Sequence, residues 1–283
     1  MPRPLGLIAG LGRFPFAVAR AGRARGDYVF AAGIHGLTDP ALADEVDELR
    51  WFHLGALQAF LSTFEDVGID EAVMAGKVPK SFLYENAADL HLDGLALEML
   101  AKLGDRKDDS LLGAFADALE AGGVKLRGQA ELTPELLVPD ETLTARGPSE
   151  AECADVAFGW PIAKSIAGLD IGQSILVKER AVIAVEAIEG TDAAVERAGM
   201  LGGAGCVVVK VAKPGQDLRF DVPVIGAETV EVLAQNGATM LAVEAHQTVF
   251  LERDRALERA DALGLCICGT LDGELRSSDG SER

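Results

Sequence analysis

Along the first half of the chain, short apolar runs alternate with longer stretches in which apolar residues recur every three or four positions. The apolar runs predict buried strands, and the longer period predicts amphipathic helices. The expected strands cover residues 5–9, 28–32, 49–54, 71–75 and 124–126. One expected helix ends near residue 26, and three others cover residues 56–67, 90–103 and 110–121. Such alternation is typical of a parallel sheet wrapped by helices. We therefore predict a Rossmann-like nucleotide-binding domain over residues 1–133.

The pattern changes between residues 134 and 149, where Thr, Pro, Glu and Gly predominate. We interpret this stretch as a linker to a second domain of mixed α/β type, the catalytic domain, over residues 150–269. Its expected elements are a helix over 150–167 interrupted at Gly159 and Pro161, a hairpin of residues 174–177 and 181–187, a helix capped by Thr191 or Asp192, strands over 206–209, 240–243 and 265–268, and helices over 228–235 and 253–263. Residues 270–283 are polar and are expected to be disordered.

The charge of the chain narrows the classes of partner. The 283 residues carry a formal net charge of −19, which repels nucleic acid and anionic lipid headgroups. Only 5% of the residues are aromatic, which also argues against a platform for stacked bases. We therefore expect no binding of nucleic acid, and a negatively charged substrate would need local cations or a metal ion.

Neither a secretory leader nor an apolar run long enough to span a bilayer is visible, so we expect a cytoplasmic protein with at most peripheral membrane contact. The four cysteines fit reduced residues in structural roles, including the pair Cys266 and Cys268, which should point the same way on a strand. The four histidines show no metal-ligand spacing, and we expect each to be satisfied singly.

The densest chemistry lies at residues 210–226, directly after the apolar run 206–209. Cations that can hold phosphate oxygens stand beside carboxylates that can hold a metal or activate water, which suggests phosphate-ester chemistry. These residues are the cations Lys210, Lys213 and Arg219 and the carboxylates Asp217 and Asp221. Loops at the carboxyl ends of strands are where open α/β sheets bind ligands. The alternative is a solvated loop with ordinary surface ion pairs.

Other acidic residues of the second half also follow apolar strands. Glu186 and Glu189 come at the end of the hairpin, and Glu244 comes at the end of the strand near 240–243. In a parallel arrangement these strand ends would gather at one edge of the sheet with the loop from Lys210 to Asp221. No nucleophile elbow is present, so metal-assisted attack of water on phosphorus suits this set better than covalent acyl chemistry.

Two glycine-containing turns of the first half were considered as phosphate sites. Gly10 and Gly12 follow the first strand, but Pro15 stands where a dinucleotide fingerprint has its third glycine. The turn can still offer backbone N–H groups to a phosphate or ribose. Gly76 and Lys77 follow another strand but lack the remaining residues of a Walker motif.

Together these stretches resemble the LpxI family of UDP-2,3-diacylglucosamine pyrophosphatases, which serve lipid A biosynthesis. The resemblance spans roughly residues 5–268. It rests on Gly6-Leu7-Ile8-Ala9-Gly10-x-Gly12-x-x-Pro15, Gly168-x-Asp170-Ile171-Gly172-Gln173, Val185-Glu186-Ala187-Ile188-Glu189-Gly190-Thr191-Asp192 and Lys213-Pro214-x-Gln216-Asp217-x-Arg219-Phe220-Asp221-x-Pro223-x-Ile225-Gly226.

The resemblance implies a two-domain enzyme that hydrolyses UDP-2,3-diacylglucosamine to UMP and 2,3-diacylglucosamine 1-phosphate (lipid X). It implies water attack on the UMP-side phosphorus with Mg²⁺ or another divalent cation, and an essential aspartate at Asp221. The remaining expected roles are catalysis by Asp217, Arg219 and Lys213, substrate binding by Gly10, Gly12, Lys77, Lys178, Lys210 and Gln216, and metal binding by Asp221, Asp217, Glu186 and Glu189. Peripheral contact with the inner-membrane surface and assembly as a homodimer are compatible with the resemblance.

Two other classes stay open at this level. A nicotinamide-dependent oxidoreductase would use the turn at Gly10 and Gly12 to hold NAD. A non-catalytic protein that binds a nucleotide sugar or a lipid could use the same cations without turnover, and Asp217 and Asp221 would then be dispensable.

Overall fold

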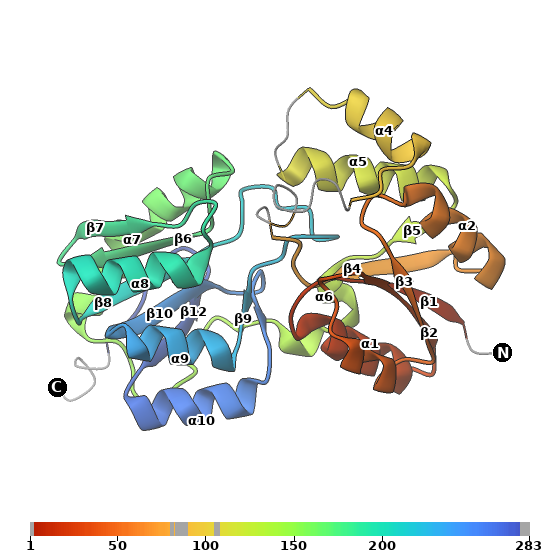
Figure 1. Ribbon diagram of the computed structural model, residues 1–283. Helices are drawn as coiled ribbons and strands as arrows, with labels where there is room; N and C mark the ends of the chain where they lie inside the picture. Colours follow the sequence, from red (N-terminus) through yellow and green to blue (C-terminus); the bar gives the residue numbers. More distant parts are fainter. Residues whose placement is uncertain (1–2, 80–81, 83–89, 105–107, 278–283) are drawn as a thin grey trace. The chain divides into compact units, whose positions relative to one another are not determined.

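The computed structural model describes residues 3–79, 82, 90–104 and 108–277. The chain divides into two compact units (Figure 1). Unit 1 comprises Met1–Pro134 together with Asp217–Asp221, and unit 2 comprises Glu135–Gln216 and Val222–Arg283. Each unit contains its own five-stranded sheet covered by helices, which confirms the predicted fold class.

The sheet of unit 1 has the strand order β3-β2-β1-β4-β5, and all its neighbouring strands are parallel. Its strands are β1 (Pro4–Ala9), β2 (Tyr28–Ile34), β3 (Glu48–Phe52), β4 (Glu71–Ala75) and β5 (Lys125–Leu126). Its helices are α1 (Phe14–Ala24), η1 (Pro40–Asp44), α2 (Leu57–Val67), α4 (Gly94–Ala101), α5 (Asp108–Ala121) and α6 (Gln129–Leu132). The direction of strand addition reverses between β1 and β4, which is the topological switch point of such a sheet.

The core of unit 1 also includes part of the second half of the chain. Phe30 of β2 and Phe64 of α2 pack edge to face, with ring centroids 5.8 Å apart. Phe220, from Asp217–Asp221, is buried in the same cluster, and the N–H of Gln129 donates to the carbonyl of Leu218 at 2.9 Å. Burial of one aromatic ring and one backbone hydrogen bond thus fix this short segment in unit 1.

The sheet of unit 2 has the order β12-β10-β8-β6-β7 and is mixed. Its strands are β6 (Ser174–Lys178), β7 (Ala181–Val185), β8 (Cys206–Lys210), β10 (Ala238–Glu244) and β12 (Cys266–Thr270), and a separate parallel pair is formed by β9 (Val224–Ile225) and β11 (Val249–Phe250). Its helices are α7 (Glu150–Gly168), α8 (Thr191–Gly202), α9 (Ala227–Gln235) and α10 (Arg253–Leu263), preceded by η2 (Pro134–Leu136). β6 runs antiparallel to both of its neighbours, whereas β8, β10 and β12 are parallel.

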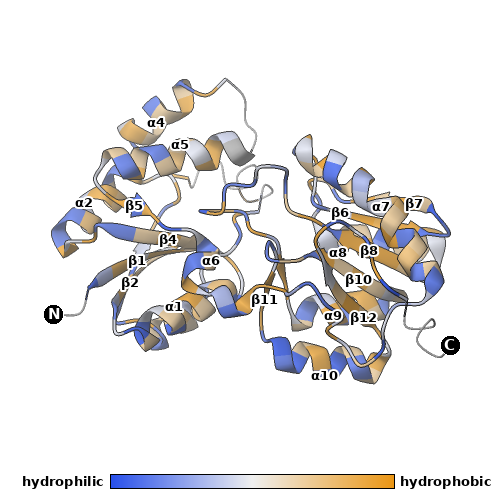
Figure 2. Ribbon diagram, turned by 180° about the vertical axis from the view of Figure 1, so that it is seen from behind, coloured by the Kyte–Doolittle hydropathy of each residue, from blue (hydrophilic) through white to orange (hydrophobic). Residues whose placement is uncertain are grey.

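Helices cover both faces of this sheet. Buried residues of α8, α9 and α10 pack on one face, and buried residues of α7 pack on the other (Figures 1 and 2). The strands between them are coloured as hydrophobic in Figure 2, as expected for a sheet that is buried on both sides. Cys266 and Cys268 point to the α7 side with their sulfurs 3.5 Å apart and are free and buried, which confirms their structural role.

α7 is continuous, although interruptions at Gly159 and Pro161 were predicted. The absent side chain of Gly159 lets the helix approach the sheet, since a Cβ there would lie 2.9 Å from a methyl carbon of Val177. Pro161 removes one N–H from the helix, and the hydroxyl of Ser165 donates to the Pro161 carbonyl. A helix packed along its length against a sheet tolerates these local costs.

The stretch predicted as a linker is paired with unit 2 over much of its length. The N–H of Val138 donates to the carbonyl of Thr248, and the N–H of Leu143 donates to the carbonyl of Ile267, both at 2.9 Å. The described part of the tail, residues 271–277, packs on α7. A Cβ on Gly273 would lie 2.5 Å from the Trp160 side chain, so only glycine allows this close approach. Residues 278–283, also predicted to be disordered, lie outside the described residues.

Candidate functional site

The carboxyl ends of three strands of unit 2 lie at one edge of its sheet. β8 ends at Lys210, β10 ends at Glu244, and β7 ends directly before Glu186. β6 runs the other way, so its first residue, Ser174, pairs with Lys210 at the same edge. The predicted gathering of Glu186, Lys210 and Glu244 at one edge is therefore confirmed, whereas Asp217–Asp221, which were expected at the same edge, belong to unit 1.

Glu186 and Lys210 are joined through a hydroxyl. The buried ammonium of Lys210 donates to Thr191 Oγ1 at 2.8 Å, and that hydroxyl donates to Glu186 Oε1 at 2.8 Å. Burial alone would raise the pKa of Glu186, but the charge of Lys210 and hydrogen bonds, including one from Thr191, outweigh it and lower the pKa. Glu186 is thus ionised and linked to a buried cation at the edge of the sheet.

The start of α8 explains why Thr191 is available for this contact. Thr191 or Asp192 was predicted to cap the helix, and that prediction is wrong: the N-cap is Gly190, with φ of 86°. Glycine adopts this left-handed conformation without a Cβ clash, so Thr191 becomes the first helical residue and faces Glu186. Glu189, three residues after Glu186, accepts instead from Arg197 of α8 at 2.6 Å.

Glu244 fixes the backbone that follows β8. One of its oxygens accepts from the N–H of Ala212 at 2.8 Å, and both accept from Lys164 of α7. The same ammonium donates to the Ala212 carbonyl at 2.9 Å. The Lys164–Glu244 pair therefore holds both backbone polar groups of Ala212, the residue before Lys213.

Lys213 is buried and forms an ion pair with Asp170, at 2.7 Å between Nζ and Oδ1. Its backbone closes a turn with Gln216, because the Lys213 N–H donates to Gln216 Oε1 and the Gln216 N–H donates back to the Lys213 carbonyl. Lys210, predicted to bind substrate, and Lys213, predicted to take part in catalysis, are thus both buried within four residues at the end of β8.

In unit 1, Asp217 and Arg219 form a bidentate pair. Arg219 Nε lies 3.0 Å from Asp217 Oδ1, and Nη2 lies 2.7 Å from Oδ2, while Nη1 reaches Glu120 of α5 at 2.7 Å. Hydrogen bonds from Arg219 lower the pKa of Asp217. Asp221 is exposed, and its φ of 56° is unusual for a residue other than glycine.

The expected metal ligands do not form a ready metal centre within either unit. Among the described residues, no group of three or more His, Cys, Asp or Glu side chains is arranged to hold a metal ion. Asp217 is held by Arg219, Glu186 by Thr191, and Glu189 by Arg197. Mg²⁺ often binds through one or two carboxylates with substrate phosphates and water, and such sparse coordination is compatible with Asp221.

The glycine turn of unit 1 is tied to the turn after β4. The N–H of Gly10 donates to the Ala75 carbonyl, and Leu11 and Lys77 exchange backbone hydrogen bonds in an isolated antiparallel bridge. A Cβ on Gly10 would lie 2.7 Å from the Lys77 carbonyl oxygen, so this glycine allows the close approach of the two turns. The structure thus brings together Gly10 and Lys77 at the switch point, with the exposed Gly12 beside them at φ of 101°.

Lys178 is the one predicted binding residue placed at the opposite edge of its sheet. It ends β6, the strand that begins at the edge with Lys210. Its ammonium donates to the carbonyls of Gly202 and Ala204, both at 2.7 Å. These contacts give Lys178 a structural role at the end of α8.

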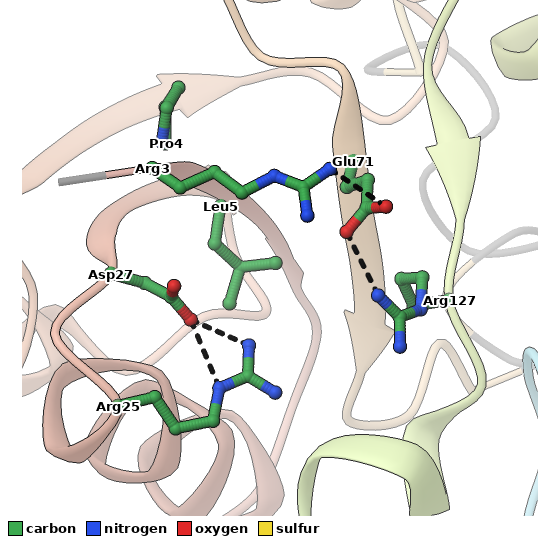
Figure 3. A pocket seen from close by; sticks show the side chains of 7 residues that line it. All are labelled: Arg3, Pro4, Leu5, Arg25, Asp27, Glu71 and Arg127. Atoms are coloured by element: carbon green, nitrogen blue, oxygen red, sulfur yellow. Dashed lines mark hydrogen bonds and ion pairs between the residues drawn. The ribbon is translucent and has the colours of Figure 1, made fainter. Parts of the chain in front are cut away.

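A cavity of about 220 Å³ lies at the amino ends of the strands of unit 1, the edge opposite the switch-point turns (Figure 3). Arginines line it, but each pairs with a carboxylate. Arg3 and Arg127 contact Glu71 at 2.9 Å, and Arg25 contacts Asp27 at 2.6 Å. Because these charges are compensated, we do not assign this cavity to the phosphate groups of a substrate.

Sequence spacing missed a cluster of aromatic rings in unit 1. His35 and His53 follow β2 and β3, and their ring centroids are 4.7 Å apart. His91 continues the stack at 4.0 Å from His53, and Trp51 lies against His35 at 5.6 Å. The expectation of singly satisfied histidines is therefore wrong for three of the four. The pairing of β2 with β3, which places His35 beside His53, could have indicated the first two.

Comparison with known proteins covers nearly the whole chain. The model of the LpxI N-terminal domain matches residues 4–136, and the model of the LpxI C-terminal domain matches residues 139–268. The UDP-2,3-diacylglucosamine pyrophosphatase LpxI of Caulobacter vibrioides is 31% identical over 279 residues, covering 94% of this chain and 97% of that protein. Two domain models in the family's order and a relative matched from end to end show that the chain belongs to the LpxI family.

Proposed function

We propose that this protein hydrolyses UDP-2,3-diacylglucosamine to UMP and lipid X, as a step of lipid A biosynthesis. The observation that carries the proposal is the full-length match to a protein named for this pyrophosphatase activity. The residues of each unit fit it chemically: unit 2 carries the buried Lys210 and Lys213 at the end of β8, and unit 1 carries the Asp217–Arg219 pair and Asp221. Cations stabilise the negative charge of a diphosphate, and a carboxylate can orient water.

In the proposed reaction, a water oxygen attacks the UMP-side phosphorus. The new P–O bond forms as the bond from that phosphorus to the bridging oxygen breaks, and the bridging oxygen leaves on the phosphate of lipid X. Asp221 orients the attacking water and receives its proton. Lys213 and Lys210 hold diphosphate oxygens, and the leaving phosphate needs this compensation most in the transition state.

Arg219 serves two purposes in the proposal. A guanidinium has five N–H donors, so its contacts to Asp217 and Glu120 do not exhaust it. It positions the turn that leads to Asp221 and can donate a further hydrogen bond to a phosphate oxygen. Gln216, Gly10, Gly12 and Lys77 are proposed to contact the substrate, and Lys178 is left out because of its position.

A divalent cation, Mg²⁺ in the first instance, is proposed as cofactor. Asp221 would hold it with the substrate phosphates, and the ion would neutralise the diphosphate against the net charge of −19. Asp217, Glu186 and Glu189 are proposed as further ligands, and each would have to share with the ion the hydrogen bond that it accepts from another side chain.

The experiment that tests the function is hydrolysis in oxygen-18 water with Mg²⁺, followed by phosphorus NMR. UMP that carries the heavy oxygen would support attack on the UMP-side phosphorus. Label in lipid X would retain the pyrophosphatase but contradict the direction of attack. Intact substrate with and without Mg²⁺ would favour a non-catalytic binding protein, and stabilisation by NAD in a thermal shift assay would favour an oxidoreductase.

Two further proposals concern partners. None of the helices in the described residues is long and apolar enough to cross a membrane. Because the proposed substrate carries two acyl chains, we propose peripheral contact with the inner-membrane surface, which flotation with phospholipid vesicles would test. A homodimer is also proposed and can be tested by analytical ultracentrifugation.

A further inference from the structure

The end of α7 contains an acidic residue where glycine is usual. The N–H of Asp170 donates to the Ala167 carbonyl, and the N–H of Ile171 donates to the Ile166 carbonyl, which together form a Schellman motif. Asp170 occupies the left-handed position of that motif, with φ of 57°. Glycine is preferred there because a Cβ is crowded in this conformation, although Asp tolerates it better than most residues do.

The charge of Asp170 is unfavourable at this place as well. The carboxyl end of a helix carries partial negative charge, which repels a carboxylate and attracts a cation. Lys213 compensates with its ion pair to Asp170 Oδ1, and both side chains are largely buried, at 9% and 12% exposure. Two local costs at one residue indicate that the carboxylate has a purpose beyond ending the helix.

The two carboxylate oxygens of Asp170 differ in their contacts. Asp170 Oδ2 is buried and, in the part of the chain that the structure describes, has no hydrogen-bond partner. A carboxylate oxygen only accepts, and leaving a buried acceptor unsatisfied is costly. A ligand that brings an O–H or N–H group to this oxygen would remove the cost.

Exposed apolar side chains flank Asp170 in the chain. Its two neighbours in the chain, Leu169 and Ile171, are 66% and 45% exposed. Ile188, two residues after Glu186, is also exposed, at 64%. The carbonyl oxygen of Glu186 approaches Gly172, two residues after Asp170, so closely that a Cβ on Gly172 would lie 2.2 Å from that oxygen. Exposed apolar side chains beside a buried acceptor suit a sugar that carries acyl chains better than a nucleoside.

From these contacts we infer that Asp170 is a substrate-binding residue: Oδ1 holds Lys213, and Oδ2 accepts a hydrogen bond from a hydroxyl or amide group of the acylated sugar. The inference rests on the proposed function and adds a binding residue to the same site. The phosphate of lipid X would lie at Lys213, next to the sugar group held by Asp170.

The test is titration calorimetry of lipid X, in mixed detergent micelles, and of UMP, against wild type and variants. Asp170→Asn keeps the shape and tolerates the left-handed backbone; its amide oxygen can stay on Lys213, which leaves an NH₂ donor where Oδ2 was. Asp170→Gly relieves the backbone strain, so a loss of binding in that variant cannot be assigned to misfolding if its melting temperature is retained. Glu231→Gln is the matched control, since it removes one carboxylate of the exposed pair with Arg259.

Both Asp170 variants are expected to bind lipid X about 10- to 100-fold more weakly, as for a lost charged hydrogen bond, and to bind UMP within about twofold of wild type. Unchanged lipid X affinity would overturn the inference, with water then satisfying Oδ2. A loss confined to UMP would assign the donor to the nucleoside and overturn the sugar contact. A loss in Asp170→Gly alone, with Asp170→Asn binding lipid X like wild type, would show that Asp170 acts only through Lys213 and would also overturn the inference. If the wild type cleaves the substrate, each of these outcomes refutes the inference and leaves the proposed function standing. A wild type that neither binds nor cleaves the substrate refutes the proposed function as well.

Discussion

Arg219 donates hydrogen bonds to both carboxylate oxygens of Asp217, two residues earlier in the chain, and its third guanidinium nitrogen donates to Glu120. The backbone N–H of Arg219 also donates to Asp217 Oδ1 at 3.0 Å, so the turn is closed by side chain and backbone together. The next two residues are Phe220, which is buried, and Asp221, which is exposed. The pair therefore determines the path by which the chain reaches Asp221.

We expect Arg219→Lys to lower kcat/KM about 10- to 100-fold. An ammonium cannot make the bidentate contact, so Asp217 and the turn before Asp221 would lose their alignment. Steady-state hydrolysis of UDP-2,3-diacylglucosamine is the measurement. Arg127→Lys is the control, because Arg127 also bridges two carboxylates, Glu71 and Glu131, but at the amino edge of the sheet. Equal losses in both variants would show a general effect on unit 1.

Asp221→Asn and Asp221→Gly are expected to abolish turnover and to leave substrate affinity within a few-fold. These substitutions are preferable to alanine, because Asn and Gly tolerate the left-handed backbone at Asp221, with φ of 56°. Single-turnover kinetics and calorimetric binding separate the two effects. Turnover retained in both variants would remove Asp221 from the mechanism.

The elements of the fold were predictable because the hydrophobic period differs between strand and helix. The run at residues 206–209 became β8, and the alternation of strands with helices gave a parallel sheet in unit 1. The edge with Glu186, Lys210 and Glu244 followed from strand direction alone. Pattern reasoning therefore worked where a side chain's place is set by the strand that carries it.

Other features depend on contacts between segments far apart in the chain. The assignment of Phe220 to unit 1 depends on its burial in the core cluster of that unit. The pairing of Asp170 with Lys213 joins the end of α7 to the loop after β8. The sequence did not indicate Gly190 as the N-cap of α8, because Thr191 is a favourable capping residue and stands next to it. In the structure the Thr191 hydroxyl donates to Glu186 and does not cap the helix. Neither hydrophobic period nor local propensity encodes such contacts.

Glu244→Gln is expected to loosen residues 211–216 without unfolding the protein. Glu244 accepts the Ala212 N–H and holds Lys164, and a neutral amide can keep only part of these contacts. Hydrogen exchange of peptides covering residues 211–216 should become faster, and kcat/KM should fall because Lys213 is less well positioned. Glu189→Gln, which removes a pair with Arg197 at the same edge, serves as control. Unchanged exchange would show that the turn at Gln216 suffices to order the loop.

Glu152 should make the stability of the protein sensitive to acid. Arg146 contacts both oxygens of this buried carboxylate at 2.8 and 3.0 Å, and both residues lie within the stretch matched by the C-terminal family model. Burial alone would raise the pKa of Glu152, but hydrogen bonds from Arg146 and Ser149 outweigh it and lower the pKa to about 2. The folded pKa lies below that of the unfolded chain, so this stabilisation, about 3 kcal/mol, is complete above pH ~4.5 and is lost as the pH falls toward ~2. In urea titrations at pH 7 and pH 3, the stability gap between wild type and Glu152→Gln should therefore narrow on acidification, whereas no such narrowing is expected for Glu231→Gln at an exposed pair. A gap that stays constant would show that the Arg146 contact does not stabilise the ionised carboxylate.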